Sequence, residues 1–158
     1  MFGEFGNNFV YTMQRLAENH PKLTVVNDLL GQSTWPRTLA EFMLHLIAVE
    51  ATYGIYHLSN HKTATWFDFA KEILKDTAVE GRTSDKCSLS AKAYRPKHSV
   101  MSLEKAKSTE FEIPSWREAL KEFYITRRSL IALNNKILLT LEVEIVLDGD
   151  VFHLFDLF

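Results

Sequence analysis

Several features that define common protein classes are scarce in this chain of 158 residues. There is one cysteine, Cys87, so an internal disulfide is excluded and no cysteine pair exists for a zinc knuckle. The 18 basic residues are balanced by 20 acidic ones, which gives no reason to expect a nucleic-acid partner. No apolar run reaches the roughly 18 residues that a membrane span needs. We therefore expect a cytoplasmic protein with neither a nucleic-acid nor a membrane partner.

Helical spacing of apolar residues is present in several segments. They cover residues 9–17, 39–47 and 65–74, and a further helix is expected after Pro114. Thr65 with Asp68, and Ser115 with Glu118, have the spacing of capping boxes, in which side-chain oxygens accept hydrogen bonds from backbone N–H groups at a helix start. In the third helix, we expect the face that carries Trp66 to belong to the core rather than to form a stacking surface.

Short apolar stretches alternate with these helices and are rich in β-branched or aromatic residues. Residues 23–26 and 53–58 are expected to be strands, and residues 78–94 are polar and poorly patterned. The alternation of helices with strands predicts an α/β fold with parallel pairing. Because two strands do not make a stable parallel sheet, the pattern indicates part of a larger sheet.

The sequence changes character after Tyr124. Residues 125–136 could extend the preceding helix. Residues 141–147, LEVEIVL, are expected to form a strand, because Glu142 and Glu144 alternate with apolar residues. Asp148-Gly149 then supplies a typical hairpin turn. Residues 125–158 are therefore interpreted as an unrelated tail, either a helix extension plus β-hairpin or an apolar end without a selected role. Residues 1–124 form the first domain in this division.

Five stretches in this order and spacing resemble the C-terminal half of the dTDP-4-dehydrorhamnose reductase family, within the extended short-chain dehydrogenase/reductase superfamily. They are GEFGNNFVYTMQRLAENHPKLTVVND (3–28), GIYHLSN (54–60), TWFDFAKEIL (65–74), AYRPKHSVMSLEKAK (93–107) and FEIPSWREALKEF (111–123). The resemblance runs from about Phe2 to Phe123. It implies an incomplete fragment of the family fold, made of the substrate-binding part and the last strands of the Rossmann sheet.

The resemblance also implies a reaction. In the intact family, an N-terminal Rossmann domain binds NAD(P)H and carries a catalytic Tyr-x-x-x-Lys, and the C-terminal part binds the nucleotide sugar. The C4 ketone of dTDP-4-dehydro-L-rhamnose is reduced to give dTDP-L-rhamnose for surface polysaccharide. The expected strand at 53–58 would join the main sheet, with its Ser59-Asn60 end facing the substrate cleft.

The motifs that carry the chemistry are missing from this sequence. Its six glycines form neither G-x-x-G-x-x-G nor G-x-G-x-x-G, the turn that lets backbone N–H groups meet a pyrophosphate. None of its five tyrosines is followed by lysine four positions later. The family loop Asp-Gln-x-Gly-x-Pro-Thr is also altered, with Leu29 for Gln and Ser33 for Pro. We expect a truncated or decayed copy that starts downstream of the catalytic strand and binds no NAD(P)H alone.

Polar residues within the matched stretches are candidates for contact with a dTDP-sugar. They are Asn7, Asn8, Gln32, Thr34 and Arg95. Asn7 and Asn8 precede a helix, where they could meet a phosphate or sugar hydroxyl or simply cap the helix. The planar fork of Arg95 suits diphosphate oxygens, and a plain surface salt bridge is its alternative role. Gln32 and Thr34 could line the cleft or be solvated. No catalytic, cofactor-binding or metal-binding residue is assigned.

Three hypotheses about function follow. The chain is the substrate-binding portion of a dTDP-4-dehydrorhamnose reductase and inactive alone, or a non-catalytic module that binds nucleotide sugars, or a non-functional remnant of marginal stability. The first hypothesis allows a separate Rossmann half as a partner. The third predicts self-association, because helix faces that a larger sheet would cover are left exposed.

Overall fold

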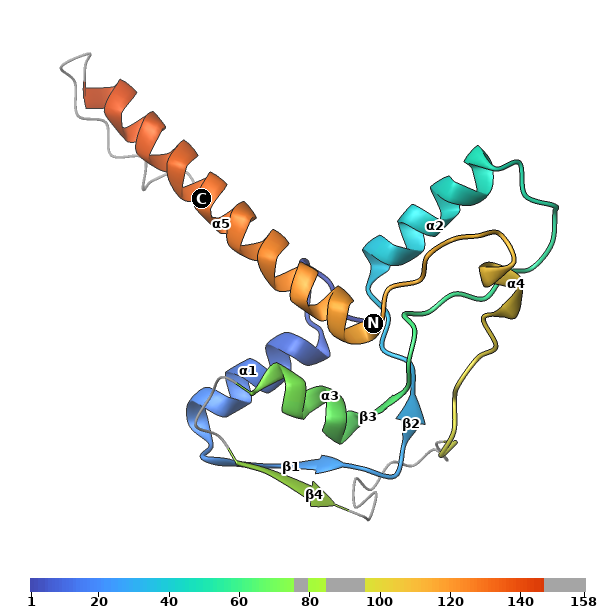
Figure 1. Ribbon diagram of the computed structural model, residues 1–158. Helices are drawn as coiled ribbons and strands as arrows, with labels where there is room; N and C mark the ends of the chain where they lie inside the picture. Colours follow the sequence, from blue (N-terminus) through green and yellow to red (C-terminus); the bar gives the residue numbers. More distant parts are fainter. Residues whose placement is uncertain (76–79, 85–95, 147–158) are drawn as a thin grey trace. The chain divides into compact units, whose positions relative to one another are not determined.

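The computed structural model describes residues 1–75, 80–84 and 96–146. It divides into two compact units, Met1–Phe123 and Tyr124–Phe158. The elements, in chain order, are α1 (Phe9–Asn19), β1 (Lys22–Val26), β2 (Leu30–Gly31), α2 (Pro36–Ala48), β3 (Ala64–Thr65), α3 (Trp66–Ile73), β4 (Glu80–Ser84), α4 (Glu104–Lys107) and α5 (Trp116–Val146) (Figure 1). The mixture of helices with short strands agrees with the α/β class expected from the sequence.

Two small sheets connect distant parts of the first unit. β1 pairs in parallel with β4, with Lys22 opposite Glu80 and Val26 opposite Ser84 (Figure 1). β2 pairs antiparallel with β3. The sequence predicted β1 but not β4, because the residues of β4, EGRTS, do not alternate between apolar and polar side chains. β4 reaches its place beside β1 through a crossover connection, which parallel strands require.

The strand expected at residues 53–58 is not formed. The segment is irregular, and no strand lies beside it within the described part of the chain. Tyr53 and Ile55 are exposed, with relative accessibilities of 106% and 78%, and only Leu58 at the end of the segment is buried. A strand exists only when its backbone groups pair with a neighbour, so a suitable local sequence was not sufficient.

Helix starts follow the local signals in the sequence. Asn8 caps α1, its side-chain Oδ1 accepting hydrogen bonds from the backbone N–H groups of Val10 and Tyr11. The capping box of Thr65 and Asp68 is present at the start of α3. At the start of α5, the N–H of Ser115 donates to Glu118 Oε2 at 2.7 Å, and the N–H of Glu118 donates to Ser115 Oγ at 3.3 Å. The cap of α1 and both predicted capping boxes are confirmed.

The end of α2 has an unusual residue. Glu50 adopts a positive φ of 49°. The N–H of Ala51 donates to Leu46 O, and that of Glu50 donates to Ile47 O. This pair of bonds is the Schellman motif, whose left-handed position is usually glycine. A glutamate at that position carries a steric cost that glycine would avoid.

The core of the first unit has two parts. In one, the ring of Phe2 lies 5.4 Å from Phe69 and 5.6 Å from Phe123, and Phe69 lies 5.5 Å from Trp116. In the other, α2 contributes Phe42, which is buried together with Leu58, Ala106 and partly buried neighbours. Aromatic side chains thus tie the beginning of the unit to its end.

The second unit contains the remainder of α5. The helix continues through Val146, so the strand expected over residues 141–146 is wrong, and the rest of the expected hairpin lies outside the described residues. A short alternating stretch is compatible with a helix when a helix is already being propagated from upstream. Among the described residues, no helix combines the length and the apolar character that crossing a membrane requires.

Candidate functional site

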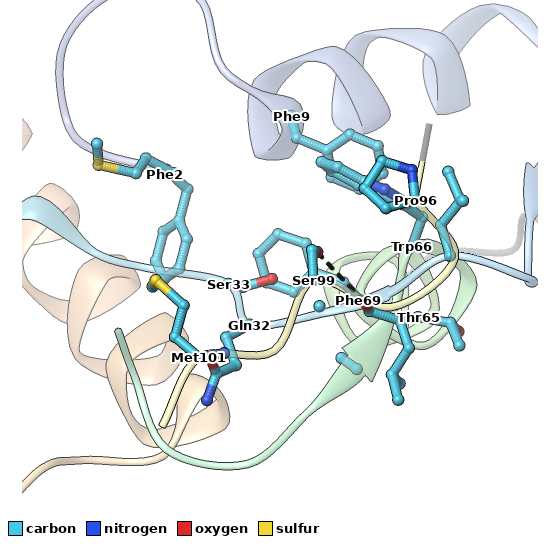
Figure 2. Close-up of a pocket in the computed structure, with 15 residues that line it drawn as sticks. Phe2, Phe9, Gln32, Ser33, Thr65, Trp66, Phe69, Pro96, Ser99 and Met101 are labelled. Carbon is cyan, nitrogen blue, oxygen red and sulfur yellow. Dashed lines mark hydrogen bonds between the residues drawn. The ribbon is translucent and has the colours of Figure 1, made fainter. Parts of the chain in front are cut away.

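A pocket of about 400 Å³ lies where the start of α1, the β2–β3 pair, the start of α3 and residues 96–101 come together (Figure 2). Its lining is Met1, Phe2, Phe9, Leu29, Leu30, Gly31, Gln32, Ser33, Ala64, Thr65, Trp66, Phe69, Pro96, Ser99 and Met101. This volume is within the range found for small-molecule sites. Such sites also have a mostly apolar lining with a few polar groups, as this pocket does.

Backbone hydrogen bonds hold the segments of the pocket together. The N–H of Leu30 donates to Lys97 O at 2.8 Å, and the N–H of Ser99 donates to Leu30 O at 3.0 Å. Gln32 extends this pairing through its side chain, since its Oε1 accepts from the N–H of Met101 at 2.9 Å. Gly31 permits the approach, because a Cβ there would lie 3.1 Å from Ser99 Oγ. One wall of the pocket is therefore formed by residues 30–32 hydrogen-bonded to residues 97–101.

An aromatic row forms another wall, and we define it as Phe69, Phe9 and Trp66. Phe9 stacks on Phe69 with centroids 5.7 Å apart and planes 17° apart. Trp66 lies 4.6 Å from Phe9 with its plane tilted by 56°. Phe69 is buried, Phe9 is intermediate and Trp66 is 40% exposed. Exposure thus increases from Phe69 to Trp66, and all three rings line the pocket (Figure 2).

The capping box fixes the position of Trp66, the first residue of α3. The N–H of Thr65 donates to Asp68 Oδ2 at 3.0 Å, and the N–H of Asp68 donates to Thr65 Oγ1 at 3.1 Å. Hydrogen bonds from the backbone and side chain of Thr65 lower the pKa of Asp68, because they favour the ionised carboxylate. At neutral pH the box is therefore complete, and the residue that follows Thr65 is held in one backbone conformation.

The structure separates the residues that the sequence proposed for substrate contact. Gln32 lines the pocket. Thr34 does not, and its carbonyl accepts a hydrogen bond from the N–H of Phe2. Asn8 is used as a helix cap, and its Nδ2 donates to Gly3 O at 2.8 Å, while Asn7 is exposed outside the lining. Arg95 lies outside the described residues.

The expectation that Ser59 and Asn60 face a cleft is wrong. Both are fully buried, and neither lines the pocket. Asn60 Oδ1 accepts from the N–H of Trp35 at 2.8 Å, and its Nδ2 donates to Thr38 Oγ1 at 3.1 Å and Pro114 O at 3.2 Å. The amide thus joins three distant segments, a structural role that a buried polar group with satisfied hydrogen bonds can fill.

Trp66 lines the pocket, although the sequence analysis placed it in the core. Its helical spacing with Phe69 predicted burial, but only Phe69 is in the core, at 3% exposure. The first residue of a helix lies at its edge, where spacing along the helix gives little information about direction. The signal available in the sequence was its position next to the capping residue Thr65.

Within residues 1–75, 80–84 and 96–146, no three His, Cys, Asp or Glu side chains are grouped so that they could hold a metal ion. The polar side chains of the pocket lining are the amide of Gln32, the indole of Trp66 and the hydroxyls of Ser33, Thr65 and Ser99. Such groups recognise a ligand by neutral hydrogen bonds.

Comparisons with known proteins agree with this architecture. A family model described as RmlD substrate binding domain matches residues 1–128. The spore coat polysaccharide biosynthesis protein SpsK of Bacillus subtilis is 35% identical over 133 residues, which are 82% of this chain and 46% of that protein. A dTDP-4-dehydrorhamnose reductase of Aggregatibacter actinomycetemcomitans is 35% identical over 135 residues, which are 76% of this chain and 46% of that protein.

Solved structures give the same result. The crystal structure of a dTDP-4-dehydrorhamnose reductase from Bacillus anthracis in complex with NADP superposes with a TM-score of 0.72 at 35% identity, covering 79% of this chain and 45% of that one. A Clostridium acetobutylicum dTDP-4-dehydrorhamnose reductase also gives 0.72, at 33% identity. This chain spans slightly less than half the length of these relatives. The resemblance recognised in the sequence is confirmed, and the chain belongs to the RmlD substrate-binding-domain family.

Proposed function

We propose that this chain is the dTDP-sugar-binding portion of a dTDP-4-dehydrorhamnose reductase of dTDP-L-rhamnose biosynthesis. The family match over residues 1–128 is the observation that carries the proposal. The lining of the pocket falls entirely within those residues, from Met1 to Met101. A substrate-binding function therefore has both a family basis and a cavity of suitable size in the same part of the chain.

The chemistry of the pocket suits a nucleotide sugar. Its apolar wall can contact a planar base or the methyl group of a deoxysugar, and removal of such surface from water contributes about 25 cal/mol per Å² before the entropy cost of binding is subtracted. Gln32 and Ser33 add hydrogen-bonding groups for the base or the sugar hydroxyls. Arg95, next to the lining residue Pro96, remains our candidate for the diphosphate, since a guanidinium binds phosphate oxygens in a bidentate manner.

Reduction of the sugar ketone requires groups that this sequence does not contain. A hydride donor and a tuned proton donor are needed, and the chain has neither the glycine-rich turn nor the Tyr-x-x-x-Lys. We propose that the chain alone does not oxidise NADPH with dTDP-4-dehydro-L-rhamnose. A Rossmann domain outside residues 1–158 would then have to supply the cofactor.

Calorimetric titration with dTDP tests the binding function. We expect weak binding by the full chain, and a loss of roughly tenfold to a hundredfold for Arg95→Ala, because a charged hydrogen bond contributes about 1.5–3 kcal/mol. Arg15→Ala is the matched control, since it removes the same charge from an exposed position on α1. Absence of binding at millimolar dTDP would refute the proposal and leave the remnant hypothesis.

A further inference from the structure

Trp66 differs from the other tryptophans of the chain in its environment. Trp35 and Trp116 are buried, at 3% and 0% exposure, and both indole N–H groups donate hydrogen bonds, to Glu4 and to Thr63 O. Trp66 is 40% exposed and lines the pocket. A large aromatic ring left partly open beside a cavity is a surface on which another planar ring can stack.

The position of Trp66 is fixed before any ligand arrives. Its backbone follows β3, which pairs with β2, and it is the first residue of α3, inside the capping box that joins Thr65 to Asp68. Its ring rests against Phe9, and Phe9 in turn stacks on the buried Phe69. A ring supported in this way loses little conformational freedom on binding, which favours affinity.

Polar groups in the same lining can recognise the edge of a planar ligand. The Oε1 of Gln32 accepts from the N–H of Met101, which leaves its Nε2 as a donor. Within the described part of the chain, neither this Nε2 nor the hydroxyl of Ser33 has a hydrogen-bond partner. A thymine base presents two carbonyl acceptors and one N–H donor along its edge, and an amide N–H with a hydroxyl complements that set.

We propose that Trp66 is the stacking surface for the pyrimidine base of the nucleotide, with Gln32 and Ser33 at the edge of that base. The proposal rests on the proposed function, because it locates the base of the same nucleotide sugar. In this arrangement the base occupies the pocket beside the aromatic row. The diphosphate and the sugar then lie away from that row. Base–aromatic stacking of this kind does not depend on charge.

The test combines binding with tryptophan fluorescence of the full chain. We expect dTDP to quench the emission of the exposed indole and inorganic pyrophosphate to leave it unchanged, since pyrophosphate has no ring. Trp66→Leu keeps an apolar side chain but removes the planar face, and should weaken dTDP binding by roughly fivefold to a hundredfold in calorimetry. Trp66→Phe retains a ring and should keep most of the affinity while abolishing the quenching.

The outcomes separate this inference from the proposed function. If dTDP binds and Trp66→Leu has the wild-type dissociation constant, the stacking role is refuted and the substrate-binding function stands. The stacking role is refuted in the same way if pyrophosphate quenches as strongly as dTDP. If dTDP does not bind at millimolar concentration, both proposals fail. Circular dichroism of each variant checks that α3 and the rest of the fold are retained.

Discussion

Replacing Asn60 with alanine should strongly destabilise the first unit, although the residue is outside the pocket. The side chain makes three hydrogen bonds, one accepted from Trp35 N–H and two donated, to Thr38 Oγ1 and Pro114 O. After truncation, Pro114 O still accepts from His61 N–H at 2.9 Å, and the Thr38 hydroxyl can rotate. The buried N–H of Trp35 would be left without its acceptor.

The magnitude follows from these partners. An orphaned buried donor costs about 1–3 kcal/mol, and each of the two donated bonds contributes roughly 0.5–1.5 kcal/mol net. The sum is about 2–6 kcal/mol, against a total stability of ~5–15 kcal/mol for a typical domain. In urea, with a slope of about 1–3 kcal/mol per molar, the unfolding midpoint should fall by roughly 1 M or more.

Urea unfolding of the full chain, followed by circular dichroism at a fixed protein concentration, measures this difference. Asn7→Ala is the matched control, because Asn7 is exposed and the same atoms are removed. Surface substitutions are usually within about 0.5 kcal/mol of the parent, and we expect that of Asn7→Ala. If Asn60→Ala also falls within that limit, the network centred on Asn60 does not hold the segments together as argued.

Three further predictions concern α2 and α3. Asp68→Asn should flatten the loss of stability in acid. The lowered pKa of Asp68 stabilises the fold above about pH 4, and this contribution disappears as the pH falls through the pKa of the folded state. The difference between the urea unfolding midpoints at pH 7 and pH 3 measures it, and we expect that difference to be smaller in Asp68→Asn. Glu50→Gly should stabilise the chain by about 0.5–1 kcal/mol in the same assay, because relief of roughly 1–2 kcal/mol of left-handed strain exceeds the entropy cost of glycine; an unchanged midpoint would contradict this reasoning. Ile47→Ser should reduce concentration-dependent association in size-exclusion chromatography, because Ile47 is 75% exposed on α2, and a wild-type monomer at all concentrations would exclude this explanation.

Local signals in the sequence predicted local structure well. The cap at Asn8 and the box of Thr65 with Asp68 depend on residues three positions apart or fewer, so the sequence contains all the information they require. The family resemblance added a prediction of the fold class to these local predictions. What could be predicted is therefore mainly the placement of the helices and of β1.

Features that depend on distant partners could not be predicted in the same way. β4 becomes a strand through its pairing with β1, although its own residues are polar. Residues 53–58 have a strand-like composition and no adjacent strand in the described part of the chain. Asn60 was expected to face the substrate cleft, but its side chain is bonded to Trp35 and Pro114, which lie far away in the sequence. Trp66 lines a pocket only because residues 96–101 return beside β2.

The contact between Phe2 and Phe123 has a consequence for how the protein is made. These rings meet at 5.6 Å, and they stand at the beginning and the end of the unit Met1–Phe123. During synthesis, Phe2 leaves the ribosome first and must wait for Phe123 before its part of the core can close. Pairing the two ends also requires closure of the whole intervening chain, an entropic cost that slows folding. The nascent chain therefore exposes Phe2 until Phe123 has been made, and in that interval Phe2 can contact a chaperone or another chain.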